Sequence, residues 1–227
     1  MKIQATENAS EATPSRAPVP AHVIAYQKLR KLILFGEIAP GQPVTIQGLV
    51  DTLGAGMTPV REAIRRLTAE GALEFQGNRR VCVPQLTQGN IDELIFARQA
   101  IEPEMVRRAA ERITASDLAR LNDIDQRLDA AIAKGDVGAY LELNYRFHYA
   151  IYELAEAPIL QALADGLWLR FGPSLRVVCG RLGTQNLPDQ HKEAIEAMAQ
   201  GQIEVAAEAM RRDAVQGMEQ VRRAFAD

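Results

Sequence analysis

Apolar residues recur at helical spacing along most of the chain from about residue 21 onward. The first segment with this period ends before Gly36, which suits the residue after a helix. The second is short, because Thr45 can cap its start and Gly54 can end it. The third begins with Thr58 as the expected N-cap and Pro59 at the first helical position. The pattern therefore predicts a helix, a short helix and another helix in the first third of the chain.

The period changes from 3.6 to 2 after Gly71. Leu73 and Phe75 alternate with polar residues, the turn QGNRR follows, and Val81 and Val83 alternate in the same way. This pattern predicts a hairpin with two arginines at its tip. Helix, short helix, turn, helix and hairpin is the order of a winged helix-turn-helix domain, which we place at residues 21–85 and call the reader.

Beyond the hairpin, residues 86–227 are expected to form an all-helical domain, which we call the bundle. The expected helices run from residue 87 to about 113 with a kink at Pro103, from about 115 to 134, from 137 to about 155, from 158 to about 178, from about 189 to 200, and from 202 to about 225. The fold class is therefore mainly α, with a winged helix-turn-helix domain followed by a six-helix bundle.

The composition also indicates where in the cell the protein resides and whether its cysteines are reduced. Residues 1–20 are rich in Ala, Ser, Thr and Pro and lack the apolar stretch of a signal peptide, so we expect a disordered tail. No apolar run approaches the roughly 18 residues of a membrane helix. Cys82 and Cys179 form no CxxC pair and are expected to be free thiols. Together these features predict a cytoplasmic protein with no membrane partner.

The net charge of −3 conceals an asymmetry between the two domains. The reader holds eight Lys and Arg against five Asp and Glu, a net charge of +3, and the bundle holds sixteen against twenty-two, a net charge of −6. Arg61 and Arg65 share the polar face of the third helix, where a guanidinium can pair with guanine in the major groove. Arg79 and Arg80 at the hairpin tip suit phosphates or the minor groove. Taken alone, such a helix is more often simply a solvated one.

Residues 23–84 resemble the DNA-binding domain of the GntR family, in GEIAPGQPV, LVDTLGAGMTPVREAIRRLTAEGALE and the hairpin after them. The resemblance implies binding to double-stranded DNA. In the FadR-like branch two arginines commonly contact bases; one position matches Arg61, and the other is Met57 here, which cannot pair with guanine as an arginine does but could touch a thymine methyl. A third contact position, on the preceding helix, is Gln47. The DNA-binding candidates are Gln47, Met57, Thr58, Arg61, Arg65, Arg66, Arg79 and Arg80.

Four side chains of the bundle could hold a metal. Asn144 and His148 lie one turn apart on one expected helix, and His191 and Asp213 lie on two others. Imidazole, carboxylate and amide groups suit a divalent metal such as Zn, Ni or Mn. From spacing alone, each histidine is more often an ordinary hydrogen-bonded residue.

Residues 91–222 resemble the FCD ligand-binding domain, in ARQAIEP, LELNYRFHYAIYELA, QHKEAIEAM and AEAMRRD, and the six helices favour its VanR-type subgroup. Many such domains bind a divalent metal through Asp, His, His and His. The matching positions here are Asn144, His148, His191 and Asp213, so two of the four identities agree. The resemblance implies a metal site; without a metal, the same side chains would form a polar effector pocket.

The effector implied by the resemblance is a small organic acid. Arg98 best matches the arginine that would meet its carboxylate, although a salt bridge with Glu102 is nearly as well supported. Tyr152 and Arg170 are secondary effector candidates. Trp168 either lines the pocket or belongs to the core.

These features together predict a homodimeric transcriptional regulator and not an enzyme. We expect a repressor that reads a palindromic operator and is released by a small organic acid. Three alternatives remain: an activator of the same family, a metal-dependent helical-bundle enzyme, and a helical interaction protein with a degenerate reader.

Overall fold

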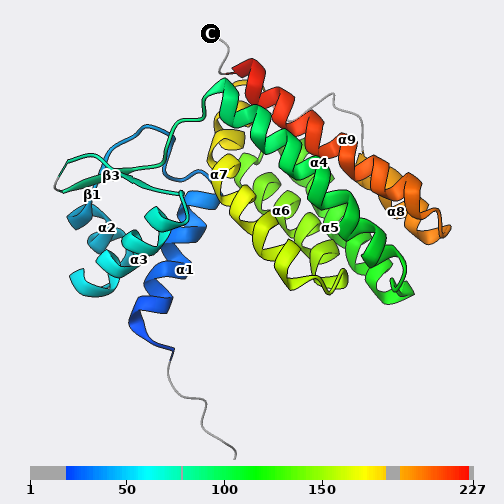
Figure 1. The fold of residues 1–227 in the computed structure, drawn as a ribbon, viewed down its shortest axis with the longest axis horizontal. Helices are drawn as coiled ribbons and strands as arrows, with labels where there is room; N and C mark the ends of the chain where they lie inside the picture. The colour runs from blue at the N-terminus through cyan, green and yellow to red at the C-terminus, as the bar shows by residue number, and fades with distance from the viewer. Residues whose placement is uncertain (1–18, 78, 183–189, 225–227) are drawn as a thin grey trace, which may run out of the picture.

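The computed structural model describes residues 19–77, 79–182 and 190–224, and the reader and the bundle lie side by side in it (Figure 1). The tail expected at residues 1–20 falls almost wholly outside the described residues. The elements of the reader are α1 (Ala21–Leu34), β1 (Val44–Thr45), α2 (Ile46–Leu53), α3 (Met57–Ala69), β2 (Glu74–Phe75) and β3 (Arg80–Cys82). Those of the bundle are α4 (Gln88–Ala110), α5 (Ala115–Lys134), α6 (Val137–Leu154), α7 (Pro158–Leu182), α8 (Gln190–Ala199) and α9 (Ile203–Ala224). The predicted fold class is confirmed.

Local signals explain how the helices of the reader begin and end. The Thr45 hydroxyl accepts a hydrogen bond from the Gly48 backbone N–H, and Gly54 ends α2 in the left-handed conformation, as predicted. The prediction of Thr58 as an N-cap is wrong. The backbone N–H of Val60 donates to the carbonyl of Gly56 at 3.2 Å, so α3 already begins at Met57 and Thr58 lies inside its first turn.

The sheet of the reader has three strands in the order β1-β3-β2, both pairs antiparallel. The hairpin β2–β3 was predicted, whereas β1 was not, because two residues are too few to show a period. Val81 lies opposite Val44 on one side and Phe75 on the other. Val81 is buried, whereas Phe75 is 52% exposed.

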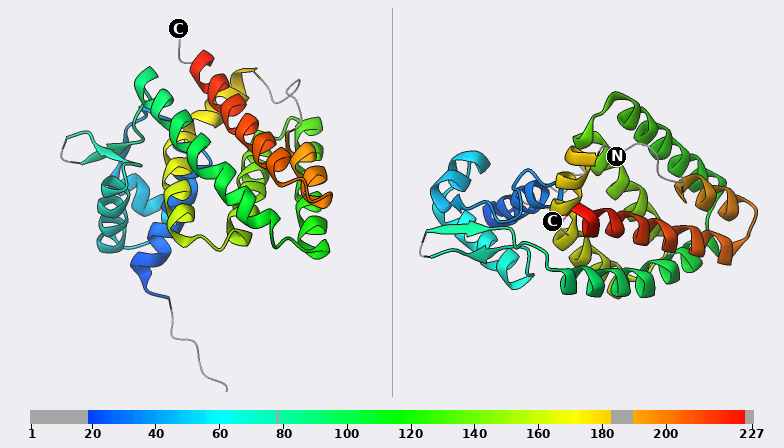
Figure 2. Two further views of the ribbon diagram at one scale, coloured as in Figure 1. Left: turned by 45° about the vertical axis from the view of Figure 1, so that its right-hand side comes forward. Right: turned by 90° about the horizontal axis from the view of Figure 1, so that it is seen from above.

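In the bundle, α4 lies beside α9, and α7 packs against α4, α6 and α9 and also against α1 of the reader (Figures 1 and 2). Capping boxes start α4 at Thr87 and α5 at Thr114, and α4 continues through Pro103. Cys82 and Cys179 are free and buried, as expected. None of the described helices combines the length and the apolar character needed to cross a bilayer.

Buried hydrophobic residues form two clusters. The larger joins the reader to the neighbouring half of the bundle, from Leu29 and Leu67 to Phe171 and Tyr152. The second fills the far end of the bundle, around Phe147. The larger cluster therefore fixes the reader against α7, and the two clusters together hold the bundle helices in place around the histidines described next.

Candidate DNA-binding surface and metal site

The amphipathic sequence of α3 presents its polar face to solvent. Val60, Ala63, Ile64 and Leu67 are buried against the reader core, which turns the opposite face outward. All the predicted DNA-binding side chains are exposed: Gln47, Met57, Thr58, Arg61, Arg65, Arg66, Arg79 and Arg80. The reader thus offers a cationic surface on α3 and on the hairpin.

The three arginines of α3 differ in how they are held. Arg61 makes no ion pair or hydrogen bond with another described residue. Arg65 forms a loose ion pair, with its Nη1 atom 3.8 Å from Oε2 of Glu62. Arg66 is bound to its own domain: its Nε donates to Glu70 at 3.0 Å and its guanidinium lies 3.8 Å from the ring centroid of Tyr26. The hydrogen bond to Glu70 raises the pKa of Arg66. Arg61 is therefore the α3 arginine most available to a DNA base.

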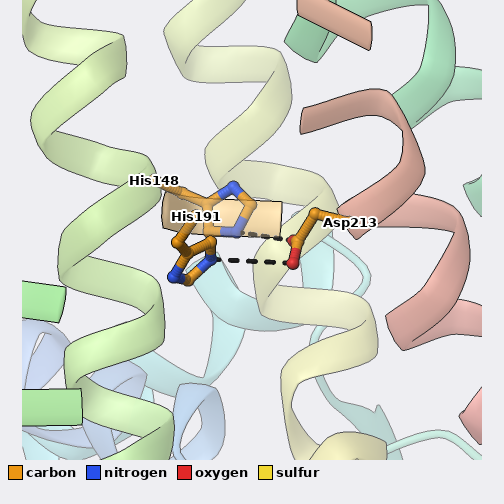
Figure 3. Close-up of side chains that lie close together, drawn as sticks. All are labelled: His148, His191 and Asp213. Atoms are coloured by element: carbon orange, nitrogen blue, oxygen red, sulfur yellow. Dashed lines mark ion pairs between the residues drawn. The ribbon is translucent and has the colours of Figure 1, made fainter. Parts of the chain in front are cut away.

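Three of the four predicted metal ligands meet in the centre of the bundle (Figure 3). His148 projects from α6, His191 from α8 and Asp213 from α9, and one ligand atom from each lies within 4.8 Å of the others. Nε2 of His148 is 3.0 Å from Oδ2 of Asp213, and Nε2 of His191 is 3.6 Å from Oδ1. Asn144 lies one turn before His148 on the same helix and is also buried.

Two further carboxylates each face the other nitrogen of one histidine. Oε2 of Glu102 is 3.3 Å from Nδ1 of His148, and Oδ1 of Asp125 is 3.4 Å from Nδ1 of His191. Such contacts fix the ring and its tautomer, so that Nε2 is the nitrogen turned toward Asp213. Sequence reasoning missed Asp125, although this aspartate among the apolar positions of α5 was a usable signal.

The charges of this cluster are closely coupled. Burial acts against ionisation of Glu102, but the Arg98 guanidinium and His148 outweigh it and lower its pKa to about 2. Burial alone would lower the pKa of His148, yet the carboxylates of Asp213 and Glu102 raise it. Burial likewise opposes ionisation of Asp213, and the two histidines hold its pKa well below the usual range. The cluster therefore favours ionised Glu102 and Asp213 facing an imidazole of His148 that binds a proton readily.

The residues predicted to contact the effector occupy two different places. Arg98 is 2% exposed and its guanidinium pairs with Glu102, so the salt-bridge alternative describes the metal-free site. Tyr152 is buried with its hydroxyl 3.5 Å from Nδ1 of His148, and it accepts a hydrogen bond from Nε1 of Trp168 at 3.1 Å. Arg170 lies outside this cluster. Trp168 faces the histidines, and a residue two positions later on the same helix points to nearly the opposite side. Arg170 therefore faces the reader, where it donates a hydrogen bond to the Glu70 carbonyl.

The donor set fits a divalent cation. The buried Nε2 atoms of His148 and His191 have no hydrogen-bond partner among the described residues, although both point at one carboxylate. The two nitrogens thus converge on the carboxylate of Asp213, and a cation between them and that carboxylate would be bound by all three groups. Two imidazoles and a carboxylate suit Zn, Ni or Mn.

Comparisons with known proteins match both halves of the chain. Residues 23–83 match the model of bacterial regulatory proteins of the gntR family, and residues 93–215 match the FCD domain. The HTH-type transcriptional regulator McbR of Escherichia coli (strain K12) is 34% identical over 147 residues, 65% of this chain and 66% of the relative. The HTH-type transcriptional repressor RspR of the same strain is 29% identical over 140 residues, 62% of this chain and 61% of the relative. The matched region thus spans slightly less than two thirds of these curated relatives.

A solved structure of E. coli McbR/YncC superimposes with a TM-score of 0.85 at 26% sequence identity, covering 92% of this chain and 100% of that one. The likeness therefore extends over the reader and the bundle together.

Proposed function

This chain belongs to the GntR family of bacterial regulatory proteins and carries an FCD domain, and from that premise we propose that it is a DNA-binding transcriptional regulator controlled by a small molecule. The observation that carries the proposal is the exposed face of α3, on which Arg61 has no partner among the described residues. The planar fork of an arginine in this position can pair with guanine. Two copies of the chain would present two such helices to a palindromic operator, so we propose a homodimer.

The bundle is proposed to sense a small organic acid. His148, His191 and Asp213, with Asn144 beside them, would hold a divalent metal that supplies a positive centre for the effector carboxylate. Tyr152 would orient the ring of His148 through its hydroxyl. Arg98 would turn from Glu102 toward the effector only if the free energy of effector binding exceeded the cost of breaking that buried ion pair. Effector binding would favour a dimer geometry that no longer fits the operator, so the protein would leave the DNA. We therefore propose that it acts as a repressor.

Operator selection tests the DNA-binding proposal. A random DNA library is enriched on the full-length protein, and the affinity of the recovered sequence is measured for two variants. Arg61→Ala should lose about 1–3 kcal/mol of binding free energy and relax preference at one base pair. Arg127→Ala removes another exposed arginine, on α5, and should leave affinity unchanged. No enrichment of any sequence, or equal losses for both variants, would reject the proposal.

Metal and effector binding need a separate test. His148→Ala should reduce the metal affinity and the response to organic acids while operator affinity without effector stays near that of the parent protein. The enzyme alternative predicts turnover of an organic acid by the metal-loaded protein, which would be detected as product formation. The relatives named above are regulators, which makes this alternative the weaker of the two.

A further inference from the structure

A cavity of about 310 Å³ lies between the reader and the bundle, away from the histidine cluster. Its reader wall includes Ala72 and Val83, and its bundle wall includes Leu94, Ala97 and Leu167. The volume lies at the lower end of the range for small-molecule sites, which often occur between domains and have mainly apolar walls. The size and lining therefore suit a compact molecule with an apolar body.

Two exposed side chains of opposite charge line this cavity, Glu93 from α4 and Arg170 from α7. Arg170 donates one Nη2–H to the Glu70 carbonyl at 3.3 Å, which leaves most of its donors free. Neither side chain forms an ion pair with any residue in the described part of the chain. A cation and an anion beside apolar walls match a ligand that carries both charges, because a simple carboxylate would meet repulsion from Glu93.

We propose that this cavity is a second ligand site, which binds a small zwitterion with an apolar body, such as an apolar amino acid. The ligand carboxylate pairs with Arg170, its ammonium group pairs with Glu93, and its apolar part lies against Leu94, Ala97 and Leu167. The site requires no metal and uses none of the histidines. Because both domains contribute a wall, the ligand favours the arrangement in which the reader is docked on the bundle.

Titration of the full-length protein with a series of apolar amino acids, from alanine to phenylalanine, tests this site in the presence of a chelator. Methyl resonances of Ala72, Ala97 and Leu94 should shift during the titration. Two analogues that share the apolar body of leucine, 4-methylpentanoate and 3-methylbutylamine, should each bind about tenfold more weakly than leucine, because each lacks one charge. An absence of shifts with every amino acid, or equal affinity for leucine and both analogues, would overturn the proposal.

A matched pair of substitutions on α4 then locates the site. Ala97→Leu fills the cavity and should abolish the amino-acid binding, whereas Ala100→Leu adds the same side chain at an exposed position of that helix and should not. Arg170→Gln should weaken leucine binding about tenfold and leave that of 3-methylbutylamine unchanged. Thermal unfolding confirms that each variant is folded. Unchanged binding by the folded Ala97→Leu variant would overturn the proposal, whatever the outcome at the metal site.

Discussion

At the scale of single residues, carboxylates decide how the two histidines are presented. Glu102 and Asp125 face the Nδ1 atoms, and Asp213 faces the Nε2 atoms. Removing a carboxylate that holds a metal-ligating histidine in this way typically lowers metal affinity about ten- to hundredfold. We therefore expect Asp125→Asn to lower the affinity for Zn or Ni by about that factor, measured by competition with a chromogenic chelator.

Asp129→Asn is the matched control for that measurement. Both aspartates lie on α5 and both approach Lys192, at 3.9 Å for Asp125 and 2.7 Å for Asp129, but only Asp125 approaches His191. Asp129→Asn should leave metal affinity unchanged. If the two variants lost affinity equally, the surface charge around Lys192 would be responsible and the orienting role of Asp125 would be wrong.

The lowered pKa of Glu102 predicts how the metal-free protein responds to acid. A carboxyl group whose pKa falls from 4.5 to about 2 on folding stabilises the protein above pH 4.5, and this contribution is lost as the pH falls toward 2. The raised pKa of His148 acts in the opposite sense, because its contribution is complete below pH 6.5 and is lost as the pH rises through the folded value.

Glu102→Gln should therefore flatten the acid limb of the stability profile. At neutral pH the variant should lose about 3–5 kcal/mol, because Arg98 would be left buried without its counter-charge. Urea unfolding of metal-free protein from neutral pH to below pH 4 measures both effects. Parallel profiles for the parent and the variant would show that another carboxyl group controls the acid limb.

At the scale of elements, α7 is the helix that joins the two domains. Arg170 donates to the carbonyl at the end of α3, and Arg176 donates to the carbonyl of Phe35 at the end of α1, each at 3.3 Å. Between them, Gly172 lies so close to α1 that an added Cβ would stand 2.5 Å from the Leu34 carbonyl oxygen. The absence of a side chain at this position lets the two helices meet.

Two glycines of α7 should consequently respond to alanine in opposite directions. Gly172→Ala should destabilise the protein by about 1–3 kcal/mol, because the added methyl group forces α7 and α1 apart. At Gly166 a Cβ meets nothing within 4 Å, so Gly166→Ala should stabilise the protein by up to about 1 kcal/mol through helix propensity. Chemical unfolding measures both. Stabilisation by both substitutions would mean that α1 yields readily to the new methyl group.

Elements of this fold were predictable wherever one period persisted for several turns, as in every helix of the bundle. Prediction failed where a contact with another element decides the outcome. The start of α3 depends on the carbonyl of Gly56, and β1 exists only because Val44 pairs with Val81. The site residues divide in the same way. The motif resemblance grouped His148 with Asp213, whereas the place of Asp125 among the apolar positions of α5 indicates burial but does not show that it lies beside His191.

At the scale of the whole molecule, the hydrophobic core crosses the boundary between the reader and the bundle. Residues of α1 and α3, such as Leu29 and Leu67, belong to one buried cluster with Trp168 and Phe171 of α7. The far end of the bundle, including Ile195 of α8, belongs to the other cluster. Since cooperative unfolding units follow contiguous packing, the natural division for unfolding lies inside the bundle and not between the two sequence domains.

Hydrogen exchange at increasing urea concentration tests that division. Peptides from α1, α3 and α7 should lose protection together, because opening any of them exposes the shared cluster. Peptides from α8 should follow a separate curve. If α1 and α3 opened at lower urea concentration than α7, the reader would be an independent unit. The contacts of Arg170 and Arg176 would then dock it without coupling its stability to that of the bundle, and a signal from the histidine cluster would have to reach the DNA by repositioning a rigid reader.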